Sequence, residues 1–97
     1  MPRNTIQNSQ TDALFDALRL LQTREEFYSF FDDLCTVKEL TAMGQRFEVA
    51  RLLDQGLTFT EITEQTGASP ATISRVNRCL QYGEGYSMIL DRIKKNE

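Results

Sequence analysis

The side chains best suited to bind another molecule gather between residues 65 and 83, where Arg75 and Arg78 are the only charged residues. Small hydroxyl and methyl side chains stand around them, and these allow a helix to approach base edges and thymine methyl groups closely. Arginine bonds guanine or phosphate, and a helix N-terminus favours phosphate. The pattern predicts contact with double-stranded DNA in the major groove. The residues expected there are Thr58, Thr60, Ser69, Pro70, Ala71, Thr72, Ser74, Arg75 and Arg78.

These residues need a helix-turn-helix to position them, and residues 58–80 have its pattern. A first helix follows Thr58, Gly67 suits a tight turn, and residues 69–80 form the second helix, which would read the groove. Five apolar residues pack the two helices together: Ile62, Ala68, Ile73, Val76 and Leu80. The alternative is an ordinary surface hairpin. The absence of acidic residues on the second helix favours the DNA-binding interpretation. Thr63 argues against it, because alanine is the usual residue at the position where the two helices of such a motif touch.

Signals for helix starts recur along the whole chain and predict an all-α fold of about six short helices. Ser9, Thr23 and Thr36 are each followed three residues later by an acid, as in a capping arrangement. The long third helix is expected to carry an apolar stripe of Leu40, Met43, Phe47, Ala50 and Leu53 and to end at Gly56. A last helix should run over about 86–94. Residues 1–8 are expected to be a flexible N-terminal tail, and residues 9–97 a single domain.

Composition excludes several classes of function. The formal net charge of −3 argues against a protein that coats nucleic acid without specificity, and the excess acid lies before residue 34. With no histidine and no cysteine beside a base, we expect no enzyme, no metal site and no cofactor. Cys35 and Cys79 fit no metal or redox motif and are expected to be reduced and packed as small hydrophobes. No signal peptide or membrane span is visible, which predicts a cytoplasmic protein.

The segment after Thr23 is apolar on several sides, since Phe27, Tyr28, Phe30 and Phe31 follow one another closely. A helix of that kind is buried, and a chain of 97 residues offers little interior of its own. A subunit interface is therefore expected, which predicts a homodimer. A compact monomer built on the same phenylalanines is the alternative.

The sequence resembles the Trp repressor superfamily, and more closely its YerC/YecD branch, over residues 36–80. The matching segments are residues 42–46, 52–56 and 67–75, and the branch resemblance continues through residues 82–85 and 91–92. The resemblance implies an intertwined helical dimer that acts as a repressor at operator DNA.

By the same resemblance, a corepressor pocket for tryptophan would involve Thr36, Arg46 and Arg75. Two departures stand against it. Val76 replaces a small glycine and would crowd an indole, and Cys79 replaces a serine and is a weak partner for an ammonium group. We therefore do not expect tryptophan as corepressor, and any small-molecule effector is unknown. The main alternative function is a helical protein-interaction module that lacks DNA affinity.

Overall fold

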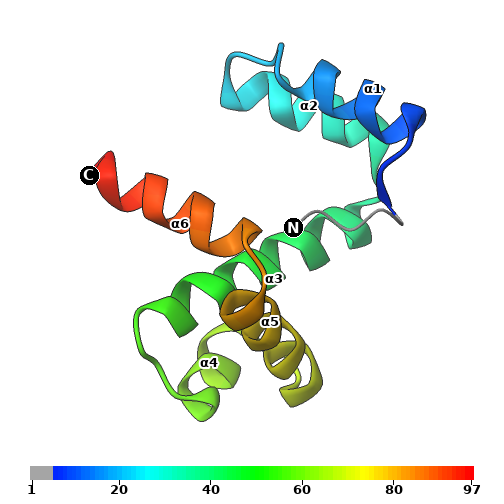
Figure 1. Ribbon diagram of the computed structural model, residues 1–97. Helices are drawn as coiled ribbons and strands as arrows, with labels where there is room; N and C mark the ends of the chain where they lie inside the picture. The colour runs from blue at the N-terminus through cyan, green and yellow to red at the C-terminus, as the bar shows by residue number, and fades with distance from the viewer. Residues whose placement is uncertain (1–5) are drawn as a thin grey trace. The chain divides into compact units, whose positions relative to one another are not determined.

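The computed structural model describes residues 6–97, and within that range it contains six α-helices and no strand (Figure 1). The all-α prediction is confirmed. The helices are α1 (Ser9–Leu18), α2 (Arg24–Leu34), α3 (Val37–Asp54), α4 (Phe59–Thr66), α5 (Pro70–Tyr82) and α6 (Gly85–Lys95). Most of the predicted N-terminal tail, residues 1–5, lies outside the described residues.

Most helices begin at the residues that the sequence predicts. Thr23, Thr36 and Ser69 each accept a hydrogen bond from the backbone N–H three residues later. The N-terminus of α1 differs: Asn8 is the cap, and its Oδ1 accepts from the Thr11 N–H at 2.8 Å, so Ser9 is already helical. The cap prediction for Ser9 was wrong by one residue, because asparagine caps a helix as well as serine does.

The chain divides into two compact units, the first reaching to Leu40 and the second running from Thr41 to Glu97. The second unit holds the core, to which α3, α4, α5 and α6 all contribute. Its buried residues are Val49, Ala50, Leu52, Ile62, Ala68, Ile73, Val76 and Leu90. On α3, Phe47 and Leu53 lie beside this core as predicted, whereas Val49 and Leu52 form a buried face that the predicted apolar stripe missed.

The first unit has no fully buried side chain among its described residues, and neither α1 nor α2 contains one. Phe30 and Phe31 are half-buried and meet edge to face, with ring centroids 6.0 Å apart. Several large apolar side chains are exposed, among them Leu20 at 78% and Val37 at 80%. By itself this unit therefore lacks a closed hydrophobic core.

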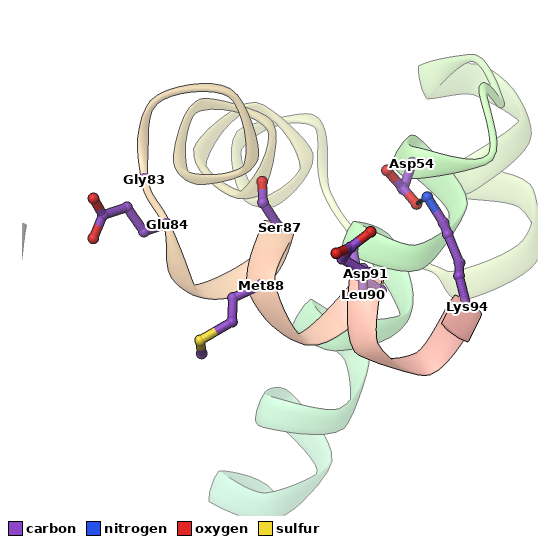
Figure 2. A pocket seen from close by; sticks show the side chains of 8 residues that line it. All are labelled: Asp54, Gly83, Glu84, Ser87, Met88, Leu90, Asp91 and Lys94. Carbon is purple, nitrogen blue, oxygen red and sulfur yellow. Dashed lines mark ion pairs between the residues drawn. The ribbon is translucent and has the colours of Figure 1, made fainter. Parts of the chain in front are cut away.

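Within the second unit, α6 packs on the core through Leu90 and Tyr86 and makes two polar contacts with α3 and α5. Leu90 enters the core, and the Lys94 ammonium lies 2.6 Å from Asp54 Oδ2 at the end of α3 (Figure 2). The Ser87 hydroxyl donates to the Leu80 carbonyl of α5 at 3.4 Å. The C-terminal helix thus joins the ends of α3 and α5.

Both cysteines are free thiols, as expected, but their packing differs from the prediction. Cys35 is partly buried and Cys79 is exposed, so Cys79 is not a packed hydrophobe. It lies on α5 outside the stripe of Ile73, Val76 and Leu80 that faces the core. Among the described residues, no helix combines the length and the apolar character that crossing a membrane requires.

Candidate nucleic-acid interface

A helix-turn-helix is formed by α4, a short turn and α5, as the sequence predicts, although α5 ends at Tyr82 instead of Leu80. Gly67 follows α4 with φ +74° and ψ +5°, in the left-handed region that glycine adopts without strain. Its N–H donates to the Thr63 carbonyl at 2.8 Å. Thr63 itself is exposed, so the concern that its side chain would separate the two helices does not apply.

The turn is held by hydrogen bonds around Thr66, the last residue of α4. The Thr66 hydroxyl donates to the Ile62 carbonyl at 2.7 Å and accepts from the Ala68 N–H at 3.1 Å. The Thr66 carbonyl accepts from Gln45 Nε2 of α3 at 3.1 Å. These bonds satisfy polar groups that the end of a helix would otherwise leave without partners.

The second helix separates an apolar inner face from a small, polar outer face. Ile73 and Val76 are 0% and 2% exposed, and Leu80 packs beside them. Eight of the nine residues predicted to contact DNA are exposed: Thr58, Thr60, Ser69, Pro70, Ala71, Ser74, Arg75 and Arg78. The arrangement leaves the outer side of α5 open to a ligand from its N-terminus to Arg78.

Thr72 is the exception, since it is half-buried. Its backbone N–H donates to the Ser69 hydroxyl, which in turn donates to Thr72 Oγ1, both at 3.2 Å. Thr72 therefore takes part in the cap of α5 and presents less of its side chain than was predicted.

At the start of α4, Thr58 and Glu61 form a reciprocal capping box. The Thr58 hydroxyl accepts from the Glu61 N–H at 3.2 Å, and Glu61 Oε1 accepts from the Thr58 N–H at 2.8 Å. Hydrogen bonds from the backbone and side chain of Thr58 lower the pKa of Glu61. Thr58 and Thr60 are both exposed at this end of the helix.

The residues of the implied corepressor pocket do not share one environment. On α3, Arg46 is half-buried, while Arg75 and Cys79 are exposed on α5. Val76 lies inside the core cluster at 2% exposure. Thr36 belongs to the first unit, where it caps α3.

An open pocket of the second unit lies elsewhere, on α6 and the ends of α3 and α5 (Figure 2). Its lining consists of Asp54, Gly83, Glu84, Ser87, Met88, Leu90, Asp91 and Lys94, and includes no residue of the predicted sites. Within residues 6–97, no cluster of three or more cysteine or carboxylate side chains is arranged to hold a metal ion.

The helix-turn-helix and the order of the six helices can be compared with known proteins. The family model described as Trp repressor protein matches residues 9–94. The chain belongs to the Trp repressor family. It is 49% identical over 98 residues to the uncharacterized protein YerC of Bacillus subtilis (strain 168), covering 100% of this chain and 94% of YerC. The resemblance to the YerC branch is thereby confirmed.

Two solved structures of the Trp repressor family share the fold. A Staphylococcus aureus protein assigned as a candidate Trp repressor superposes with a TM-score of 0.90 at 49% identity, over 97% of this chain and 95% of that one. A TrpR-like protein of Eubacterium eligens ATCC 27750 has a TM-score of 0.91 at 44% identity, over 95% and 96% of the two chains. The Trp-repressor-like fold is therefore shown over nearly the whole chain.

Two residues of the site, Gln45 and Thr66, were not predicted from the sequence. Gln45 precedes Val49 by one helical turn and thus shares its core-facing side of α3. A polar residue on a buried face signals a hydrogen-bond partner nearby. That signal was present, but the predicted apolar stripe ran through Phe47 and Ala50, which left Gln45 on a different face.

Proposed function

We propose that this protein is a sequence-specific transcription regulator that binds double-stranded DNA as a homodimer and acts as a repressor. The observation that carries the proposal is the outer face of α5, where Arg75 and Arg78 are exposed among small side chains and no acid is present. Such a face fits the major groove, where arginine reads guanine and small side chains allow close approach. Membership of the Trp repressor family supports the same role. A regulator of this kind acts on the chromosome, so a cytoplasmic location remains our prediction.

The homodimer is supported by the first unit, in which none of the described residues 6–40 is completely buried. Its exposed apolar residues include Phe15 at 51%, Leu20 at 78% and Val37 at 80%. Exposed apolar area of this extent on one small unit favours association. A second copy of the chain, with its helices intertwined, would cover these residues and supply the core that the unit lacks.

We further propose that tryptophan is not the corepressor. Val76 is packed in the core beside α3 and α4, and an indole would have to displace it. Cys79, which is exposed, offers only a weak hydrogen-bond acceptor to an ammonium group. These residues are consistent with a regulator that needs no cofactor, or with one that binds an effector chemically different from tryptophan. Catalysis forms no part of the proposal.

Selection of bound fragments from a random DNA pool tests the proposal, because a repeated palindromic motif reports both DNA binding and the two-fold symmetry of a dimer. With the selected operator, Arg75→Ala should weaken binding by about 5- to 150-fold, the loss expected for one good base contact of about 1–3 kcal/mol. Arg92→Ala, which removes an equal charge from α6, is the matched control and should bind nearly as the parent does.

Two outcomes would contradict the proposal. Equal affinity of Arg75→Ala and the parent would remove Arg75 from the interface. Failure of every fragment to bind, together with salt-insensitive binding of a protein partner, would favour the alternative of a protein-interaction module.

A further inference from the structure

The hydrogen bond between Gln45 and Thr66 joins the long helix α3 to the turn of the helix-turn-helix. Gln45 Nε2 donates to the Thr66 carbonyl at 3.1 Å, across 21 residues of sequence and in a partly buried environment. The other hydrogen bonds of the turn link α4 to residues within it or directly after it. This hydrogen bond thus connects the turn to α3, a helix that lies outside the helix-turn-helix.

The acceptor of this bond lies at the point where the direction of the chain changes. Thr66 ends α4, Gly67 takes the left-handed conformation, and Ala68 is 1% exposed in the core. The two helices of the motif meet at this point, so the position of the Thr66 carbonyl is coupled to the angle between α4 and α5. Because Gln45 of α3 binds this carbonyl, the hydrogen bond restrains the angle between α4 and α5 relative to α3.

We propose that Gln45 is a positioning residue for DNA binding, which sets the orientation of α5 through the Thr66 carbonyl. The inference rests on the proposed function of α5. Gln45 does not need to touch DNA for this role. Without the hydrogen bond from Gln45, the turn and α5 adopt additional orientations. Only the molecules in which α5 has the DNA-binding orientation bind, so the apparent affinity for DNA falls in proportion to their fraction.

Two substitutions at Gln45 separate this role from a loss of packing. Gln45→Leu removes the donor and keeps an apolar stem. Gln45→Glu keeps the shape of the side chain, but a carboxylate cannot donate to a carbonyl, whereas the protonated acid can. Because only the neutral acid makes the bond and the site is partly buried, the pKa of this introduced group should lie above the ordinary value for glutamate.

The experiment compares operator affinity at pH 8.0 and at pH 5.5, which is still above the isoelectric point of about 4.9. At pH 8.0 both variants should bind about three- to tenfold more weakly than the parent. At pH 5.5 Gln45→Glu should recover part of the loss, and Gln45→Leu should recover none. Other charged groups of these helices, including Arg46 on α3 and Glu61 and Glu64 on α4, are also present in the parent, so the ratio of variant affinity to parent affinity cancels their contribution.

Gln55→Glu is the matched control, since it places the same charge at the exposed residue that follows α3 and should show no pH-dependent ratio. Melting temperatures recorded at both pH values separate folding from positioning. A lower melting temperature with parental affinity would overturn the positioning role, and so would equal behaviour of the glutamate and leucine variants. If the parent itself binds no DNA, the proposed function fails as well, whereas failure of the pH-dependent recovery overturns this inference alone.

Discussion

Two glycines should respond to alanine with opposite signs, because the same methyl group enters two different backbone conformations. Gly67 has φ +74°, and an added Cβ would meet no atom within 4 Å. Gly44 lies inside α3 with ordinary helical geometry, and its Cβ would also meet nothing within 4 Å. Steric clash is therefore excluded at both positions within the chain, and only the backbone preference remains.

For Gly67→Ala, the left-handed conformation costs an L-residue about 1–2 kcal/mol. The lower entropy of the unfolded chain offsets about 0.4–1 kcal/mol of this cost. A net loss of about 1 kcal/mol follows, which lowers the melting temperature by about 4–8 °C for a domain of this size. Gly44→Ala should instead add about 0.5–1 kcal/mol, since alanine is the better residue within a helix.

Thermal unfolding of both variants at one fixed chain concentration measures the two shifts, because the stability of a dimer depends on concentration. Parental stability of Gly67→Ala would show that the turn does not need the left-handed conformation described above. A loss of stability in Gly44→Ala would show that the surroundings of Gly44 in the assembled protein are closed, contrary to the open space around it in the single chain.

Two further predictions concern assembly and the corepressor. Phe30→Asp should leave no folded monomer in sedimentation and circular dichroism, because a core shared between chains makes folding and association one process; a stable, helical, monomeric variant would contradict the intertwined arrangement. Millimolar tryptophan should change neither the melting temperature nor operator affinity, whereas a ligand at a hundred times its dissociation constant would add about 2.7 kcal/mol; a rise of several degrees would show that Val76 leaves room for the indole.

The helix-turn-helix could be predicted because its signals are local. Thr58 and Glu61 lie three residues apart, Ser69 stands directly before Pro70, and Gly67 marks the turn between them. Each of these interactions joins residues within about one helical turn of each other, so the order of residues along the chain is enough to predict it. The outer face of α5 followed from the same register, and Thr72 departed from it only because the cap of the helix engages its side chain.

Contacts between distant residues could not be predicted in the same way. The bond from Gln45 to Thr66 depends on how α3 packs against α4, and that packing uses Val49 and Leu52 as well as the predicted stripe. A helix with apolar residues on two neighbouring faces does not reveal which face its neighbours cover. The exposure of Cys79 has a different origin, because Cys79 lies outside the stripe of Ile73, Val76 and Leu80 and the register of α5 alone indicated it.

Because the first unit by itself lacks a closed hydrophobic core, the lifetime of the protein in a cell should depend on assembly. A helix pair without a closed core unfolds locally at little cost, and locally unfolded segments are where proteases cut first. If the protein forms the proposed homodimer, a newly made single copy would be degraded through this unit, while the assembled pair would be protected. The amount of regulator would then follow the square of the synthesis rate at low expression, so that a small change in synthesis produces a larger change in occupancy of the DNA.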